Sequence, residues 1–360
     1  MKRICIIPNV SGVGGMVSFR SKFTAGLRAR GIEVSHHASR TTRHDAILVI
    51  GGTRDLLSLW RAKRRGVRIV QRLNGMNWLH RQVNTGLRHY LRAEYGNWIL
   101  QFIRSRLADR IVYQSKFSRQ WWERVHGPTP VPSSIVHNGV DLSTYTPMPP
   151  GSPAPALPTD RYRLLMVEGS LMGGYELGLE TAVGLVETLN DAHPQELGKP
   201  VELMVVGRVA DSVKTRYSER LNPPIIWRGL VKPEEIPKID RSAHLLFASD
   251  INAACPNSVI EALACGTPVL AFDTGALLEL VAGDSGRVVP YGGDPWQLEN
   301  PDIPALAEAA VEILLNQERF RPAARARAEE AFGLGTMVDG YLGDLFTTKA
   351  RRHEENIYDS

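Results

Sequence analysis

The 360-residue sequence contains only three cysteines, Cys5, Cys255 and Cys265. They form no C-x-x-C pair, and no cluster of histidines and cysteines has the spacing of metal ligands. This scarcity excludes a disulfide framework and a zinc ribbon, and it is typical of proteins in a reducing compartment. We therefore expect a cytoplasmic protein with no metal site.

Long hydrophobic runs are also missing, because no stretch approaches the roughly 18–20 apolar residues that a membrane-spanning helix needs. The short apolar run at residues 4–7 ends at Pro8 and Asn9, and no small-residue cleavage site follows it. These features indicate a buried first strand rather than a signal peptide. We expect any membrane contact to be peripheral, at the inner membrane face.

Acidic residues are scarce in the first 150 residues, which contain 24 lysines and arginines but only 7 aspartates and glutamates. The remaining 210 residues contain 19 basic and 31 acidic side chains. The net charge of +5 therefore conceals a basic half and an acidic half. A hydrophobic content of 43% is enough for two folded domains and excludes a wholly disordered chain.

Short apolar runs alternate with helical stretches along most of the chain. The runs at residues 46–50, 67–71, 201–206 and 269–272 are each followed by a glycine within four residues, and the run at 269–272 is the last clear strand. This alternation is typical of parallel sheets covered by helices on both faces, which bind ligands at the carboxyl ends of their strands. The fold class is therefore α/β, with two Rossmann-like doubly wound domains that face each other across a cleft.

Proline and small residues dominate residues 147–158, which read PMPPGSPAPALP, so no regular element can persist there. We place the first domain at residues 1–146, an interdomain linker at 147–160 and the second domain at 161–335. Residues 336–349 are predicted to be helical, and the polar tail follows.

The segment 249–268 (SDINAACPNSVIEALACGTP) is the most informative stretch for chemistry. A helix should begin near Asn257 and Ser258, with Glu261 one turn further on. Free backbone N–H groups at such a helix start suit a phosphate, and the carboxylate could accept hydrogen bonds from sugar hydroxyls. The same residues could equally be helix caps and a solvated first-turn acid. The spacing leaves both interpretations open.

Several segments together resemble the family 4 glycosyltransferases, which are retaining enzymes of the GT-B fold. Residues 137–141 (HNGVD) are similar to their interdomain signature. Residues 259–271 (VIEALACGTPVLA) are similar to the helix and strand that carry the second glutamate of their E-x7-E motif. The glycine-rich loop at Gly14 and Gly15 matches their amino-terminal loop. The resemblance covers nearly the whole chain and implies an enzyme that uses a nucleotide-sugar donor.

The resemblance also implies roles for individual residues. Glu261 would hold the ribose hydroxyls of the donor, and the backbone at Asn257 and Ser258 would lie against the phosphates. The remaining donor contacts would come from the main chain of the glycine loop and of the base pocket: Gly14, Gly15, Gly229 and Leu230. The first domain would receive the acceptor, and the terminal helix within residues 336–360 would cross back to it.

The sequence departs from the family pattern at the charged positions of the site. The position of the first glutamate of E-x7-E is Ala253, and the two cations that usually clamp the diphosphate would fall near Gly169 and Gly174. Charge-assisted contacts are worth about 1.5–3 kcal/mol each, so their loss needs replacement. Arg208, which follows a strand, is the candidate replacement, although a surface arginine is an equally good interpretation.

The family histidine that meets the sugar or acceptor corresponds to Asn74. Asparagine cannot act as a general base, but it can orient a substrate by hydrogen bonding. In the family mechanism the departing phosphate takes the proton of the acceptor, so positioning matters more than a side-chain base. No D-x-D sequence occurs, which leaves a metal-dependent GT-A scheme without support. The expected catalytic residues are Glu261 and Asn74, with no metal or other cofactor.

The positive charge of the first half concentrates at residues 61–72 and 81–92. Such a surface suits a lipid-linked phosphate or an anionic membrane. Solvated arginines without a partner are the alternative for any single residue. Nucleic acid is not favoured, because no nucleic-acid-binding motif accompanies the charge.

Two functions remain open from the sequence. The first is a metal-independent retaining glycosyltransferase that moves a sugar to a glycan, lipid-linked or small-molecule acceptor. The second is a catalytically impaired protein of the same fold that acts as a binding or regulatory subunit. The altered positions at Asn74, Gly169, Gly174 and Ala253 favour the second, and Glu261 favours the first.

Overall fold

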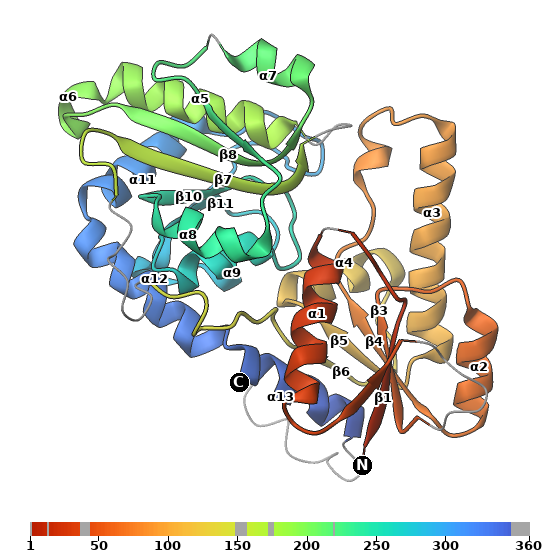
Figure 1. The fold of residues 1–360 in the computed structure, drawn as a ribbon. Coiled ribbons are helices and arrows are strands. Elements are labelled where there is room, and N and C mark those ends of the chain that lie inside the picture. Colours follow the sequence, from red (N-terminus) through yellow and green to blue (C-terminus); the bar gives the residue numbers. More distant parts are fainter. Residues whose placement is uncertain are drawn as a thin grey trace, which may run out of the picture.

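The computed structural model describes residues 2–12, 14–36, 44–147, 157–171, 176–218 and 220–346. They form two α/β domains that lie side by side, each built on a six-stranded parallel sheet (Figure 1). The prediction of two doubly wound domains is confirmed. Gly174, most of the predicted linker and the polar tail lie outside the described residues.

The sheet of the first domain has the strand order β2-β1-β3-β4-β5-β6. Its strands are β1 (Arg3–Ile7), β2 (Glu33–Ser35), β3 (Ala46–Ile50), β4 (Arg68–Leu73), β5 (Arg110–Tyr113) and β6 (Ser133–Ile135). Its helices are α1 (Gly15–Arg28), α2 (Leu56–Arg64), α3 (Leu87–Phe102) and α4 (Lys116–His126). A short 3-10 turn, η1 (Leu79–Arg81), precedes α3.

Alternation along β1 explains why this sheet is covered on both faces. Ile4 and Ile6 pack with α1, whereas Cys5 and Ile7 pack with α2 and α3. Because successive side chains of a strand point to opposite faces, the side chains of this apolar run pack into the two cores on either side of the sheet.

The sheet of the second domain has the order β12-β11-β10-β7-β8-β9. Its strands are β7 (Tyr162–Leu171), β8 (Val201–Val209), β9 (Ile226–Gly229), β10 (Leu245–Ala248), β11 (Val269–Phe272) and β12 (Gly286–Val289). Its helices are α5 (Leu177–Ala192), α6 (Pro194–Leu197), α7 (Asp211–Ser218), α8 (Ile236–Arg241), α9 (Asn257–Ala264), α10 (Leu277–Leu280), α11 (Ile303–Leu315) and α12 (Gln317–Ala331). The prediction that residues 269–272 form the last strand is wrong, because β12 pairs with β11.

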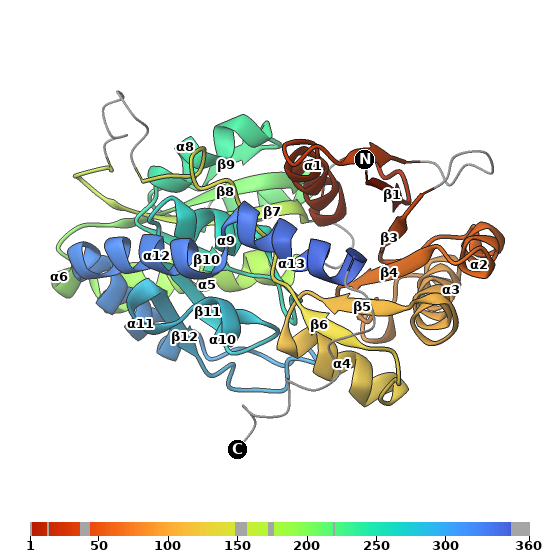
Figure 2. The same ribbon diagram turned by 90° about the horizontal axis from the view of Figure 1, so that it is seen from below.

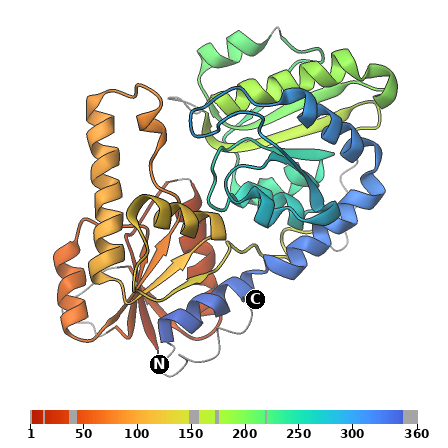
Figure 3. The same ribbon diagram turned by 180° about the vertical axis from the view of Figure 1, so that it is seen from behind.

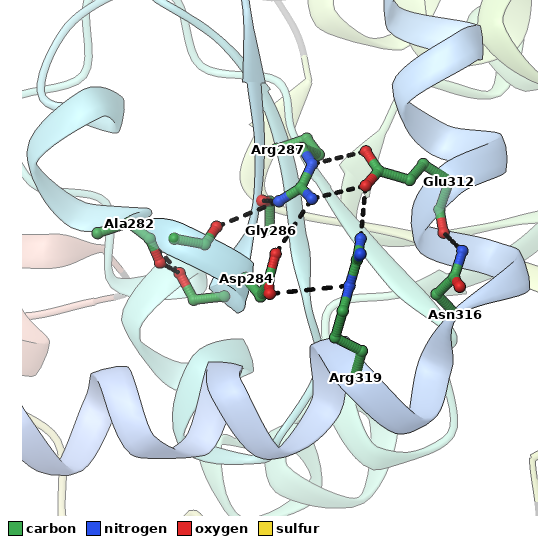
Figure 4. Close-up of polar contacts among 9 residues, drawn as sticks. Ala282, Asp284, Gly286, Arg287, Glu312, Asn316 and Arg319 are labelled. Atoms are coloured by element: carbon green, nitrogen blue, oxygen red, sulfur yellow. Dashed lines mark hydrogen bonds and ion pairs between the residues drawn. The ribbon is translucent and has the colours of Figure 1, made fainter.

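An ionic network fastens α11 and α12 to the edge strand β12 (Figure 4). Arg287 on β12 makes two hydrogen bonds to the carboxylate of Glu312, at 2.6 and 2.7 Å, and Arg319 contacts the same carboxylate. These arginines hold the pKa of Glu312 at about 2, mainly through the Arg287 hydrogen bonds. The network fixes the outer layer of the second domain.

The last helix, α13 (Leu334–Phe346), passes from the second domain to the first. Figures 2 and 3 show α12 and α13 running in succession along both domains. Met337, Val338, Tyr341 and Leu345 are buried in the core that α1 covers. In the described part of the chain, the backbone therefore crosses between the domains near residue 140 and again between α12 and α13.

Within the described residues, no helix combines the length and apolarity needed to cross a membrane. All three cysteines are buried free thiols.

Candidate functional site

A cavity of about 190 Å³ lies between the two domains. The lining residues come from the segment after β4 and the start of α3 in the first domain. In the second domain they come from the ends of β7 and β10, the start of α5 and the loop after β12: Met76, Asn77, Trp78, Leu79, His80, His89, Glu168, Ser170, Leu171, Leu177, Gly178, Ser249, Asp250, Ile251 and Leu298. Strands β7 and β10 are neighbours where the strand order reverses. In open α/β sheets this crevice is the usual ligand site.

Two carboxyl groups line the second-domain side of the cavity. The hydroxyl of Ser249 donates a hydrogen bond of 2.8 Å to Oε1 of Glu168. Burial, reinforced by the nearby Asp250, raises the pKa of Glu168 to about 8, and burial raises the pKa of Asp250 to about 6. Glu168 is therefore largely protonated at neutral pH, so it can donate a hydrogen bond and does not repel an anionic ligand.

Sequence reasoning missed Glu168 and Asp250. Each lies at the carboxyl end of its apolar run, which is the edge where ligands bind in parallel sheets. That position was a usable signal, but neither residue belongs to the family motif.

The glycine loop and the start of α9 meet across the domain boundary. A Cβ atom built on Gly15 would lie 3.8 Å from Nδ2 of Asn257. Pro256 is the N-cap of α9, and no side chain in the described part of the chain caps the helix. The alternative that Asn257 and Ser258 cap α9 is therefore wrong, and the first-turn N–H groups keep their capacity to bind an anion.

Glu261 lies one turn into α9 and forms an ion pair with Lys22 of α1. The distance from Lys22 Nζ to Glu261 Oε1 is 2.8 Å, and both side chains are less than one fifth exposed. The ammonium also lies 5.6 Å from the ring centre of Tyr145. Lys22, which sequence reasoning missed, thus brings a cation of the basic domain to the predicted ribose-binding residue.

The other predicted residues take separate places. Arg208 is exposed and pairs in register with Ser170, so both residues lie at the same level of neighbouring strands beside the cavity. Asn74 directly follows β4, and its carbonyl oxygen accepts a 2.7 Å hydrogen bond from the indole of Trp122. Gly229 ends β9, and Leu230 follows it on the surface. None of the predicted site residues lines the cavity: Gly14, Gly15, Asn74, Arg208, Gly229, Leu230, Asn257, Ser258 and Glu261 are all absent from its lining.

Further contacts join the two domains. Trp296 of the second domain packs against Trp78 and Trp121 of the first, with ring centres 5.1 and 4.9 Å apart. On the far side of α9, the carboxylate of Glu279 accepts hydrogen bonds from the backbone N–H groups of Lys116 and Phe117. Within the described residues, no group of three or more His, Cys, Asp or Glu side chains could hold a metal ion.

Two facing Rossmann-like domains with a ligand crevice between them define a GT-B architecture, the fold of one large class of glycosyltransferases. Residues 36–144 match the family model described as Glycosyltransferase Family 4. Residues 179–316 match the model described as Glycosyl transferases group 1. The two matches fall in tandem on the two domains, and the chain belongs to the family 4 glycosyltransferases.

Named relatives agree with this assignment. The lipopolysaccharide core biosynthesis mannosyltransferase LpcC of Rhizobium leguminosarum is 26% identical over 325 residues, covering 81% of this chain and 84% of the relative. A D-inositol 3-phosphate glycosyltransferase of Gordonia bronchialis is 25% identical over 187 residues, covering 49% of this chain and 40% of the relative. The match to the second relative therefore spans less than half of that protein.

Solved structures share the whole architecture. The sucrose-phosphate synthase of Thermosynechococcus elongatus has a TM-score of 0.71 at 17% identity, covering 96% of this chain and 98% of the other. Anabaena HepE in complex with UDP-glucose has a TM-score of 0.65 at 14% identity, covering 96% and 99%. At such identities the likeness concerns the fold alone.

Proposed function

We propose that the protein moves a sugar from a nucleotide-sugar donor to a glycan, lipid-linked or small-molecule acceptor, with retention of configuration and without a metal ion. The observation that carries the proposal is the meeting of the glycine loop with the uncapped start of α9, one turn before Glu261. HepE, which has the same fold, is described in complex with UDP-glucose. This supports a nucleotide-sugar donor here.

In this proposal the donor lies along α9. The first-turn N–H groups at Asn257 and Ser258 face the diphosphate, and the carboxylate of Glu261 accepts hydrogen bonds from the ribose hydroxyls. The departing phosphate takes the proton of the acceptor, and Asn74 orients the sugar or acceptor. Because no strong base is involved, the step depends on charge stabilisation around the phosphates.

Three features offset the missing diphosphate cations at Gly169 and Gly174. Arg208 lies beside the cavity at the level of Ser170. Lys22 brings an ammonium group from the first domain to Glu261. Burial keeps Glu168 protonated, so the crevice carries less negative charge than its composition suggests. These features favour a working donor site over the alternative of a catalytically impaired binding subunit.

A nucleotide panel read by thermal shift tests the donor. A ligand at 100 times its Kd stabilises a protein by about 2.7 kcal/mol, which raises its Tm measurably. We expect UDP, GDP or a sugar conjugate of one of them to raise the Tm of the native protein and to leave Glu261→Ala unchanged. The absence of a shift with every nucleoside diphosphate and nucleotide sugar would remove the enzyme proposal.

Turnover separates the two functions. With the donor found in that panel, an enzyme releases free nucleoside diphosphate in the presence of a suitable acceptor, and the anomeric proton of the product in NMR reports retention or inversion. Activity that persists in EDTA agrees with metal independence. Nucleotide binding without any turnover over a broad acceptor panel would favour the binding subunit instead.

The acceptor side belongs to the first domain in this proposal. The relatives are named for the lipopolysaccharide core and for inositol phosphate, which are hydroxyl-rich acceptors that carry negative charge. The excess of 24 basic over 7 acidic residues in the first 150 residues complements such an acceptor or an anionic membrane. We therefore place the reaction in the cytoplasm, at the inner membrane face.

A further inference from the structure

Helix α3 exposes a stripe of large apolar side chains along its outer face. Leu87, Leu91, Tyr95 and Trp98 recur at intervals of three and four residues, which places them on one side of the helix. They are 75, 60, 48 and 52% exposed. The inner side of α3 buries Ala93, Asn97 and Ile99. A folded domain has no stability reason to expose such a stripe, so an interaction surface is indicated.

Helix α2 extends this surface. Its side chains Leu57 and Trp60 are also about half exposed. Leu59 of α2 and Ile99 of α3 are buried in the same core, so the two helices lie on the same face of the sheet. The guanidinium of Arg54 lies 6.0 Å from the ring of Tyr95 and links the helices at the surface. Both helices lie on the side of the first domain that faces away from the second (Figures 1 and 3).

Cations surround the apolar side chains. We call the combined surface the α2–α3 face, and its exposed residues are Arg54, Leu57, Trp60, Arg61, Arg64, Leu87, Arg88, Leu91, Arg92, Tyr95 and Trp98. The five arginines outnumber the neighbouring acids Asp55 and Glu94. Asp55 accepts the Ser58 N–H at the start of α2, and Glu94 pairs with Arg81 and His80. The face is therefore both apolar and positively charged.

We propose that the α2–α3 face inserts its apolar side chains into the interfacial region of an anionic lipid bilayer. Tryptophan and tyrosine side chains favour the headgroup level of a bilayer. Arginines at the rim can bind lipid phosphates with their guanidinium groups while their aliphatic stems stay in contact with apolar surface. Charge complementarity selects this occupant. A second copy of the same face would place five arginines opposite five others, and these like charges repel. The phosphate backbone of a nucleic acid would offer no apolar surface for the leucines.

The face also has a meaningful position relative to the site. His89, in the first turn of α3, lines the interdomain cavity, two residues from Leu87 and Leu91. Insertion of the stripe would thus hold the mouth of the cavity next to the headgroups. This inference rests on the proposed membrane-associated function. It adds shallow insertion of apolar side chains to the electrostatic attraction that the basic residues provide.

Sedimentation with vesicles tests the proposal on the full chain. The probes are phosphatidylcholine vesicles with and without 30% phosphatidylglycerol, at low and high NaCl. We expect the protein to bind anionic vesicles and a fraction of it to stay bound at high salt. Salt screens electrostatic attraction but does not weaken the insertion of apolar side chains. Leu91→Ser and Trp98→Ser should each lower the salt-resistant partition coefficient about tenfold, the effect of removing roughly two buried methylene equivalents.

Controls separate insertion from adsorption and from misfolding. Leu315→Ser removes an exposed leucine from the second domain and should bind as the native protein does. Brominated lipids should quench tryptophan fluorescence in the native protein and less in Trp60→Ser/Trp98→Ser. Circular dichroism and the nucleotide-induced thermal shift should be unchanged in every variant, so a failure here is distinct from a failure of the proposed catalysis.

Four results would overturn the proposal. One is no binding to anionic vesicles. A second is binding that high salt abolishes without any bromine quenching, which describes electrostatic adsorption only. A third is equal loss of binding in Leu315→Ser. The last is a native dimer, seen by analytical ultracentrifugation, that Leu91→Ser dissociates, since the face would then be a contact between two copies of the chain.

Discussion

Lys22 and Glu261 form the residue-scale link between the basic and the acidic half of the chain. The two groups are 2.8 Å apart and mostly shielded from water, so each compensates for the desolvation of the other. The buried Asp240 also lies near Glu261. Burial, and then the charge of Glu261, raise the pKa of Asp240 well above its ordinary value. Without Lys22, Glu261 would face this environment with no counter-ion.

Lys22→Met should therefore destabilise the protein by about 1–3 kcal/mol, because it leaves a largely buried carboxylate unpaired. Urea unfolding with an unchanged m-value measures the loss. In the double variant Lys22→Met/Glu261→Gln the charge is gone, and most of the stability should return. Equal stability of Lys22→Met and the native protein would show that the pair contributes nothing.

Glu168 gives a pH-dependent prediction. Burial first, and then the Asp250 charge, raise its pKa from 4.5 to about 8, so the folded state disfavours the ionised form. The stability that this protonated group contributes is complete below about pH 4.5 and is lost as the pH rises through about 8. Glu168→Gln should consequently gain Tm relative to the native protein across that range.

Calorimetric Tm values at pH 5, 7 and 9 measure this difference. The exposed Glu234→Gln is a matched control on the same domain and should follow the native curve at each pH. A constant offset between Glu168→Gln and the native protein at all three pH values would contradict the raised pKa.

At the residue scale, the family resemblance, and not the spacing alone, pointed to Asn257, Glu261 and the glycine loop. The structure places them along one boundary between the domains, and their role in donor binding stays a prediction. Lys22 could not be predicted this way. It is 239 residues from Glu261 in the chain, and only the packing of α1 beside α9 brings the charges together. Long-range pairs of this kind leave no local pattern.

At the scale of elements, the contact between α1 and α13 depends on a glycine. A Cβ atom on Gly26 would lie 2.6 Å from Cγ2 of Val338, which is fully buried and has a stiff branched side chain. The two helices can approach this closely only because Gly26 has no side chain. This contact fastens the C-terminal crossing helix to the first domain.

Gly26→Ala should destabilise the protein, since overpacking costs about 1–3 kcal/mol against a helix-propensity gain of about 1 kcal/mol. Gly343→Ala, on α13, is the control, because an added Cβ there meets no atom within 4 Å, and only the propensity gain applies. Thermal unfolding should rank Gly343→Ala above Gly26→Ala. Adding Val338→Ala to Gly26→Ala should relieve the clash, and no relief would contradict this packing.

The strongly apolar strands could be predicted because they are buried on both faces, as in the fully buried run 46–50. Strand β12 escaped prediction for the opposite reason. It is a four-residue edge strand, Gly286–Val289, with an arginine inside it and mostly half-buried side chains. Its strand character comes from pairing with β11 and from the Arg287 network, neither of which is encoded locally.

At the scale of the whole molecule, one half-buried carboxylate joins the domains on the side away from Lys22. Glu279 of α10 accepts hydrogen bonds of 2.7 and 2.6 Å from the backbone N–H groups of Lys116 and Phe117, at the start of α4. Burial raises its pKa, but the imidazole of His137, 3.6 Å away, and these two N–H groups outweigh it, so the net shift is downward. The contact is thus present at neutral pH and is lost in acid, as the pH falls through the lowered pKa.

The N–H groups of α4 and the partial positive charge of its N-terminus make this contact worth roughly 1–2 kcal/mol. Glu279→Ala should therefore loosen the contact between the two domains without unfolding either domain, because Ser115 still caps α4.

Small-angle X-ray scattering at pH 7 should show a larger radius of gyration for Glu279→Ala, and the native protein should approach that value in acid. Glu329→Ala, which breaks only a surface pair with Arg325 on α12, should scatter as the native protein does. If the cleft works by domain closure, the loosened variant should bind the donor nucleotide more weakly, although Glu279 lies outside the cavity lining. Scattering identical to that of the native protein would mean that α13 and the Trp296 cluster are sufficient to hold the domains together.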